Sequence, residues 1–171
     1  DGGYDKTTTD FNELKELHEE FKTKLTKDID YTKNAKPISP GKYTVIFSPI
    51  ATGVFTHESF GHKSEADFMI GDETMKAEWT IGKKVGAENL SIVDRGDVKG
   101  SGFVPFDDEG NKSEKTYLIK DGVLSGRLHS GATAESLEEN TTGNARALNF
   151  EFEPIVRMTT TYIEAGDETK E

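Results

Sequence analysis

Apolar residues recur at helical spacing near the start of the chain. Five of them follow one another at intervals of three or four residues, namely Phe11, Leu14, Leu17, Phe21 and Leu25. This spacing places them on one face of an α-helix. Asp10 precedes the stripe and Glu13 lies three residues further on, an arrangement typical of a capping box at a helix start. We therefore predict an amphipathic helix that begins after Asp10 and packs through its apolar face.

The pattern changes after residue 42 to short β-branched and aromatic runs separated by turn residues. It predicts strands at 43–47, 75–81, 91–93, 116–119, 123–128 and 153–163, and helices at 51–69 and 133–138. Asp121 and Gly122 separate two of the runs and indicate a hairpin, because both tolerate a positive φ. Strands joined by hairpins after a helix predict an α+β fold with a mainly antiparallel sheet. We divide the chain into an N-terminal tail, helix and linker (1–41), an α+β domain (42–165) and an acidic tail (166–171).

Composition narrows the possible functions. The 171 residues carry a formal charge of −11, which disfavours a nucleic-acid binder working through a broad basic face. No apolar run approaches the roughly 20 residues of a membrane span, so we expect neither a nucleic-acid nor a membrane partner. The absence of cysteine excludes disulfides and all-Cys zinc sites within these residues. The start at Asp1 rather than Met suggests a fragment of a longer protein.

One short motif carries metal-binding chemistry. His57-Glu-Ser-Phe-Gly-His62 places two histidines five residues apart with an acid beside the first. In an ideal α-helix two side chains at this spacing diverge by roughly 140°, so shared zinc binding requires a helix that ends, tightens or bulges between them. Gly61 makes such a deviation cheap through its backbone freedom. Glu58 is suited to take a proton from water activated by a metal.

The motif alone leaves other interpretations open. On the six residues alone, we favour a solvent-facing helix with incidental histidines. Catalytic zinc usually has three protein ligands, and Glu65, Asp67 and His129 are the candidates for the third within this chain. For Glu65 and Asp67 the competing interpretation is an ordinary surface acid, and for His129 it is a surface or edge position.

Five segments in the same order, spanning about 42–163, resemble one family. Residues 57–67 closely resemble the metal-site segment of the TldD/PmbA metallopeptidases, also called modulator of DNA gyrase proteins. Residues 107–110, 118–126, 142–146 and 154–162 are similar to further segments of that family. The histidine motif places the chain on the TldD-like side, since the partner-like members lack it.

The resemblance implies a zinc-dependent peptidase that cleaves unfolded or extended peptides in the cytoplasm. It implies that His57 and His62 are metal ligands, that Glu58 is the catalytic general base, and that three residues line the substrate-binding wall: Gly143, Asn144 and Arg146. Members often pair with a related subunit as a homo- or heterodimer. Their third ligand is usually a cysteine further toward the C-terminus, so we expect this chain to be part of the C-terminal region, with zinc weakly held or absent.

Several alternatives stay open at this point. Arg146 either holds a substrate carbonyl or carboxylate, or pairs with a nearby acid. The strand at 155–163 is ordinary sheet core, or it offers an edge to an extended peptide. For the acids at 107–109 we favour a solvated turn over a second metal site. The rival to a peptidase is a non-catalytic protein-interaction module or an inactive fragment of such a protease.

Overall fold

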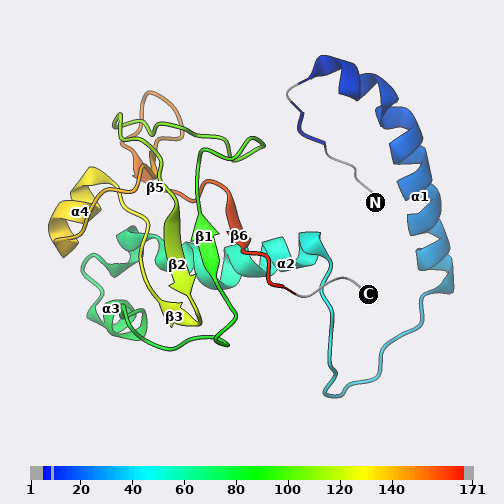
Figure 1. Cartoon of the computed structure of the whole chain (residues 1–171), viewed down its shortest axis with the longest axis horizontal. Helices are drawn as coiled ribbons and strands as arrows, with labels where there is room; N and C mark the ends of the chain where they lie inside the picture. The colour runs from blue at the N-terminus through cyan, green and yellow to red at the C-terminus, as the bar shows by residue number, and fades with distance from the viewer. Residues whose placement is uncertain (1–5, 9, 168–171) are drawn as a thin grey trace. The chain divides into compact units, whose positions relative to one another are not determined.

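A computed structural model describes residues 6–8 and 10–167 and divides the chain into two compact units, Asp1–Ile46 and Phe47–Glu171 (Figure 1). Residues 168–171, most of the predicted acidic tail, lie outside the described residues, as do 1–5 and 9. Within the described part, no helix has both the length and the apolar character needed to cross a membrane.

The first unit contains the predicted amphipathic helix. A 3₁₀ segment, η1 (Phe11–Glu16), continues into α1 (Leu17–Asn34). Asp10 is the N-cap, and its carboxylate accepts a hydrogen bond from the Asn12 N–H at 2.8 Å. The Glu13 carboxylate accepts from the Thr8 hydroxyl instead of completing a capping box. No residue of η1 or α1 is buried, so the packing role of the apolar face stays a prediction.

The second unit is built on an antiparallel sheet. Its four strands are β1 (Ile92–Asp94), β2 (Thr116–Lys120), β3 (Val123–Leu124) and β6 (Thr161–Ile163), in the order β3-β2-β1-β6. Every neighbouring pair is antiparallel, and β4 (Ala145–Arg146) forms a separate antiparallel pair with β5 (Ile155–Val156). Asp121 and Gly122 make the β2–β3 turn with φ of 51° and 78°. The predicted α+β class and the hairpin are confirmed.

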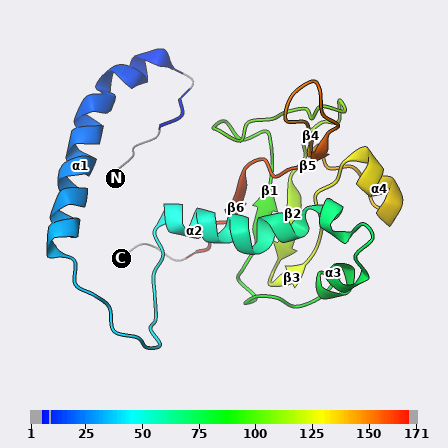
Figure 2. The same ribbon diagram turned by 180° about the vertical axis from the view of Figure 1, so that it is seen from behind.

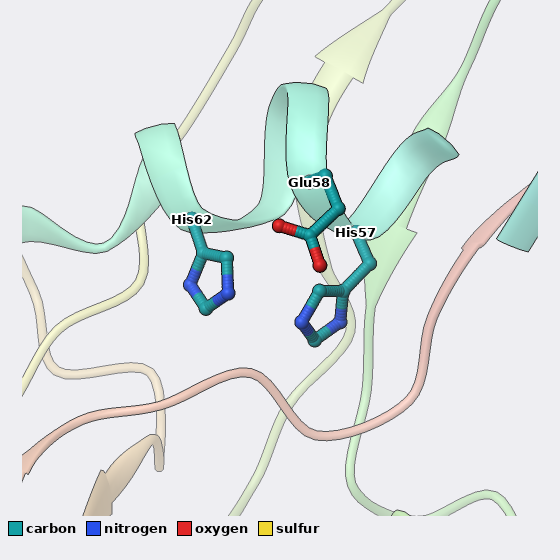
Figure 3. A group of neighbouring side chains, drawn as sticks. All are labelled: His57, Glu58 and His62. Atoms are coloured by element: carbon teal, nitrogen blue, oxygen red, sulfur yellow. The ribbon is translucent and has the colours of Figure 1, made fainter. Parts of the chain in front are cut away.

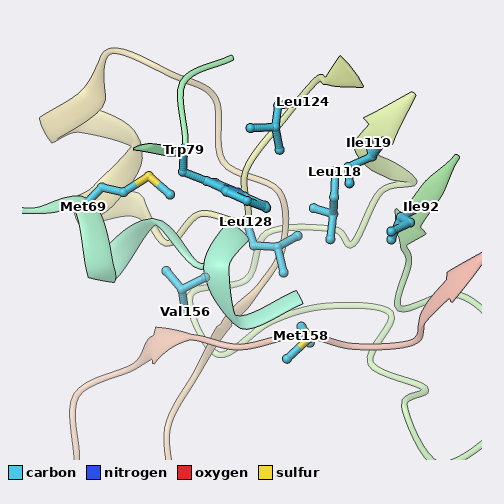
Figure 4. Close-up of a cluster of buried hydrophobic side chains, with 9 residues drawn as sticks. All are labelled: Met69, Trp79, Ile92, Leu118, Ile119, Leu124, Leu128, Val156 and Met158. Carbon is cyan, nitrogen blue, oxygen red and sulfur yellow. The ribbon is translucent and has the colours of Figure 1, made fainter. Parts of the chain in front are cut away.

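The second unit also contains several helical segments. They are α2 (Pro49–Thr56), the π-helix η2 (His57–Gly61), the 3₁₀ segments η3 (His62–Ser64) and η4 (Ala66–Met69), α3 (Glu73–Glu78) and α4 (Gly131–Leu137). Figure 2 shows α2 and its continuation crossing one face of the sheet, where both α2 and η2 contact β6. The buried core lies between these segments and the strands (Figure 4); it comprises Met69, Trp79, Ile92, Leu118, Ile119, Leu124, Leu128, Val156 and Met158.

Two predicted strands are wrong. Residues 43–47 are extended, but they belong to no strand and are exposed, with Ile46 98% accessible. A β-branched run becomes a strand only when a partner pairs with it, and the described residues supply none. Residues 75–81 were also predicted as a strand, yet α3 occupies most of them. Asp72 caps α3 by accepting from the Met75 N–H at 2.9 Å, and the helix formers that follow outweigh the aromatic and β-branched end of the run.

Two further predicted elements are shorter than expected. Of 123–128 only β3 is strand, and of 153–163 only β5 and β6 are. Between β5 and β6, two backbone N–H groups donate to side-chain carboxylates. The Thr159 N–H donates to Asp94 at 2.9 Å, and the Met158 N–H donates to Glu65 at 3.4 Å. Carboxylates therefore take the place of a neighbouring strand there. The helix predicted at 51–69 is present but divided into four pieces, and two of the three junctions lie at the two histidines of the motif.

Candidate functional site

The histidine motif coincides with a single turn of π-helix. The His62 N–H donates to the carbonyl of His57, an i→i+5 bond that widens the turn by one residue relative to an α-helix. The wider turn places residues that are five positions apart on the same side of the helix, just as an α-helix does for residues four positions apart. The His57 and His62 rings consequently lie 4.6 Å apart between centroids at 84° (Figure 3). The expected departure from regular helix geometry between the two histidines is confirmed.

Gly61 serves this turn for a different reason than expected. Its φ of −59° and ψ of −60° are ordinary helical values that any residue adopts, so the expectation that it supplies backbone freedom is wrong. A Cβ at this position would instead overlap Sδ of Met158. The missing side chain lets the histidine turn approach the segment between β5 and β6.

The three functional groups of the motif converge. One ligand atom each from His57, Glu58 and His62 lie within 4.8 Å of one another (Figure 3). A tetrahedral site with bonds near 2.1 Å places its ligands about 3.4 Å apart, so small side-chain rotations bring these atoms to bonding distance. The His57 and Glu58 side chains are exposed, and neither has a hydrogen-bond partner among the described residues. Imidazole nitrogens are common zinc ligands, so the two histidines fit the implied metal, with the Glu58 carboxylate beside them.

His62 differs from His57 in having a protein partner. Its Nδ1 lies 3.0 Å from Oε2 of Glu65, and its side chain is about one-third exposed. The Glu65 side chain is only 1% exposed. Glu65 was a candidate third ligand from the sequence, but the structure places it behind His62 rather than in the converging group.

The other two candidate third ligands lie elsewhere. Oδ2 of Asp67 accepts the Val156 N–H at 2.7 Å, and this contact ties the histidine segment to β5. His129 is 1% exposed, so its expected surface or edge position is wrong. Its Nε2 lies 3.0 Å from Oε2 of Glu139, and its Nδ1 lies 3.2 Å from the Thr133 hydroxyl. Burial lowers the pKa of His129 below its ordinary value of 6.5, although Glu139 opposes the shift.

The residues expected in the substrate-binding wall make contacts within the protein. Asn144 is buried and its amide donates to Asp94 and to the Arg157 carbonyl, both at 2.9 Å. Arg146 donates to the carbonyl of Met158. Gly143 has a φ of 74°, and a Cβ there would meet the backbone of residues 112 and 113 at 2.6 Å. These contacts shape the loop that faces the 157–159 segment.

Asp94 is an organising residue that the sequence did not single out. It is 1% exposed and accepts from the Thr159 N–H and hydroxyl, from the Thr161 hydroxyl at 2.6 Å and from Asn144. The only local signal is an acid that ends an otherwise apolar strand. A buried carboxylate with this many donors fixes the path of the chain that runs past the histidine turn.

The acids at 107–109 also organise backbone. Asp107 is 6% exposed and accepts from the N–H groups of Glu109, Asn111 and Ala145, so it is not the solvated turn residue that we expected. Glu109 accepts the Gly131 N–H at 2.7 Å at the start of α4. These carboxylates accept hydrogen bonds from backbone N–H groups of the loops around them and so stabilise those loops.

A cavity adjoins the histidine turn. Its volume is about 270 Å³, and it is lined by His62, Lys63, Phe68, Asp72 and Met75. Phe68 and Met75 contribute apolar surface to its lining, whereas Lys63 and Asp72 contribute charged groups. The cavity is large enough for one side chain of a bound molecule.

Sequence comparisons identify relatives of this chain. The family model described as the PmbA/TldA metallopeptidase C-terminal domain matches residues 40–171. A metalloprotease of Synechocystis sp. is 47% identical over 133 residues, which are 77% of this chain and 29% of that protein. The zinc metalloprotease TldD homolog of Saccharolobus solfataricus is 35% identical over 141 residues, 81% of this chain and 31% of that protein. The chain thus spans less than a third of these relatives.

Solved structures show the same fold. A putative modulator of DNA gyrase from Thermotoga maritima superposes with a TM-score of 0.56 at 23% identity, covering 69% of this chain and 26% of that one. TldE from Thermococcus kodakarensis gives a TM-score of 0.57 at 20% identity with the same coverage. Together, the family match over most of the chain and the relatives above 30% identity show that this chain belongs to the PmbA/TldD metallopeptidase family.

Proposed function

We propose that this chain provides the metal-binding and proton-transferring part of a zinc-dependent peptidase. His57 and His62 would hold the zinc ion, and Glu58 would act as the general base. The observation that carries the proposal is the convergence of the three groups on the π-helical turn. Zinc supplies Lewis acidity, which polarises a peptide carbonyl and makes a water molecule easier to deprotonate.

The chain's own residues supply positioning and proton transfer. The Glu58 carboxylate is exposed and has no hydrogen-bond partner among the described residues, so it is free to accept a proton from water. Its place beside both rings lets the same oxygen pass that proton to the amine that leaves when the peptide bond breaks. The two imidazoles orient the reacting groups relative to Glu58 because one turn of helix holds all three.

The substrate we propose is an unfolded or extended peptide. Strand β6 lies at the edge of the four-stranded sheet and contacts η2, so a bound extended segment could pair with it near the histidines. The cavity beside His62 offers room for a substrate side chain. We retain as proposals the substrate-binding roles of Gly143, Asn144 and Arg146, which would act through the loop they shape.

The wider biological setting is also proposed. The structural likeness to TldE supports pairing with a related subunit, as a homo- or heterodimer, and we propose a cytoplasmic location. We further propose the division of the chain into 1–41, 42–165 and 166–171. Because the chain spans 29% of the Synechocystis relative, these statements concern the longer protein to which it would belong.

Replacing Glu58 tests the proposed chemistry. In the full-length protein, Glu58→Gln should leave zinc binding intact and lower peptide hydrolysis by about 10²- to 10⁴-fold, the usual contribution of a general base. Glu78→Gln is the matched control, because Glu78 is also an exposed helical glutamate. Undiminished hydrolysis by Glu58→Gln would remove Glu58 from this role.

A second candidate function is a non-catalytic interaction module. Exposed apolar side chains on α2 favour it, with Ile50 78%, Val54 58% and Phe55 47% accessible. Metal analysis separates the two: stoichiometric zinc that disappears in His57→Ala supports the peptidase. A metal-free full-length protein with full partner binding supports the module.

A further inference from the structure

Among the described residues outside the converging group, Glu65 is the one whose carboxylate hydrogen-bonds a histidine of that group, namely His62. The Glu65 side chain is 1% exposed, whereas the His62 side chain is 36% exposed. The Oε2–Nδ1 distance of 3.0 Å is a good hydrogen bond. An ionised carboxylate only accepts hydrogen bonds, so Nδ1 must carry the hydrogen. Nε2 of the neutral ring is then left with the lone pair that a cation needs.

The position of Glu65 is fixed from both sides. Its neighbours Ser64 and Ala66 exchange backbone hydrogen bonds with Leu128, at 2.8 Å and 3.0 Å. Its second oxygen, Oε1, accepts the Met158 N–H at 3.4 Å, and the Arg157 guanidinium lies 3.8 Å from Oε2. These contacts leave the Glu65 carboxylate little freedom to rotate away from His62.

We propose that Glu65 is a positioning residue for the metal centre: it fixes the His62 ring in the Nδ1–H form and aims Nε2 at the zinc ion. The inference deepens the proposed function and rests on it. It replaces the earlier hypothesis that Glu65 is itself a ligand. Carboxylates that accept from the far nitrogen of a ligating histidine typically contribute 10- to 100-fold to metal affinity.

Glu65→Gln is the decisive variant because it keeps the size of the side chain. The amide has a single oxygen, but two donors face the native carboxylate, the Met158 N–H and the His62 Nδ1–H. The backbone N–H cannot become an acceptor, whereas the imidazole can switch its tautomer. The glutamine oxygen should therefore face Met158 and its NH₂ group should donate to Nδ1 of His62, leaving the hydrogen on Nε2.

Asp67→Asn is the matched control. Asp67 lies two residues further along and also accepts a backbone N–H, that of Val156 at 2.7 Å, but it makes no contact with His62. A purely structural contribution of the 64–67 segment should appear in both variants. A positioning role should appear only in Glu65→Gln.

Two measurements on this chain test the proposal. Nitrogen NMR of the metal-free protein, at about pH 8.5 where imidazoles are neutral, reads the His62 tautomer. We expect Nδ1–H in the wild type and in Asp67→Asn, and Nε2–H in Glu65→Gln. Competition titration with zinc should show a 10- to 100-fold weaker affinity for Glu65→Gln alone.

Specific outcomes would overturn the proposal. One is a wild-type His62 that already carries its hydrogen on Nε2. Others are an unchanged tautomer or zinc affinity in Glu65→Gln, or an equal loss of affinity in Asp67→Asn. If the wild-type chain binds no zinc, the tautomer measurement still decides whether Glu65 sets the state of His62, and the proposed metal centre fails only if the full-length protein also binds none.

Discussion

The protein contains two histidine–glutamate arrangements that use the same chemical groups in opposite ways. In the motif site, defined as His57, Glu58 and His62, the functional groups are largely exposed and converge on one point. In the His129 cluster, defined as His129, Thr133, Glu139 and Arg127, both ring nitrogens of a buried histidine have partners, and Arg127 pairs with Glu139. Both regions contain histidine and glutamate, so the difference between a candidate metal site and a structural network lies in whether the ring nitrogens and carboxylates already have hydrogen-bond partners.

The two arrangements also hold their histidines in opposite tautomers. The Glu139 carboxylate faces Nε2 of His129, so Nε2 carries the hydrogen and the Thr133 hydroxyl can donate to Nδ1. The Glu65 carboxylate faces Nδ1 of His62 and leaves Nε2 available. No lone pair of His129 is left for a metal, whereas His62 keeps one.

The largest expected difference between the two regions appears when each histidine is removed. His129→Ala should lower the free energy of unfolding by about 2–4 kcal/mol, because it leaves a cavity and removes the buried partner of Glu139 and Thr133. His57→Ala should change that free energy by less than about 0.5 kcal/mol, since His57 is exposed, and should abolish stoichiometric zinc binding in the full-length protein. Urea denaturation and metal analysis measure both.

The comparison would fail if these effects were exchanged. A His129→Ala protein that loses zinc but not stability would place His129 in the metal site. A His57→Ala protein that is strongly destabilised would make His57 a structural residue.

Two helical glycines near the motif site should respond oppositely to alanine. Gly61→Ala should destabilise the protein by about 1–3 kcal/mol, because the new Cβ meets Met158 and forces a shift in a packed region. Gly53→Ala, in the middle of α2 with nothing within 4 Å of its Cβ, should stabilise by about 0.5–1 kcal/mol through helix propensity. Thermal or urea denaturation gives both values, and stabilisation by Gly61→Ala would contradict the close approach described here.

The smallest expected effect is a pH dependence that belongs to the His129 cluster. Because the folded state lowers the pKa of His129, only the unfolded chain binds a proton as the pH falls below about 6.5. Stability should therefore decrease with falling pH in that range, by at most about 1.4 kcal/mol per pH unit. The carboxyl groups of Glu164 and Asp97 have a lowered pKa in the folded state. They therefore add to the loss of stability when the pH falls below their ordinary pKa values of 4.5 and 3.8.

His129→Gln isolates this contribution. The variant should show a shallower loss of stability than the wild type when unfolding is measured between about pH 6.5 and pH 5. Equal slopes in the two proteins would mean that His129 does not hold a lowered pKa in the folded state.

The sequence predicted those features that depend on neighbouring residues. Local spacing predicted the N-terminal helix, the hairpin at Asp121 and the irregular turn between His57 and His62, and the structure contains all three. The strand predicted at 43–47 failed because pairing depends on a distant partner that no local pattern specifies.

The contacts around the candidate site could not be predicted either, because they join residues that are distant in the sequence. Asp94 and Thr159 lie 65 positions apart in the sequence, and Glu65 and Met158 lie 93 apart. Their contacts depend on how the sheet and the histidine turn pack together. The sequence therefore indicated the converging residues of the motif site but neither the role of Glu65 behind His62 nor the burial of His129.

The most direct test of the central claim is zinc X-ray absorption spectroscopy on the metal-loaded chain. We predict two imidazole nitrogens at about 2.0–2.1 Å from the metal in the wild type, and the loss of this two-imidazole signal in His57→Ala and in His62→Ala. A spectrum with no imidazole contribution, or one left unchanged by both substitutions, would contradict a site formed by the two histidines of the π-helical turn.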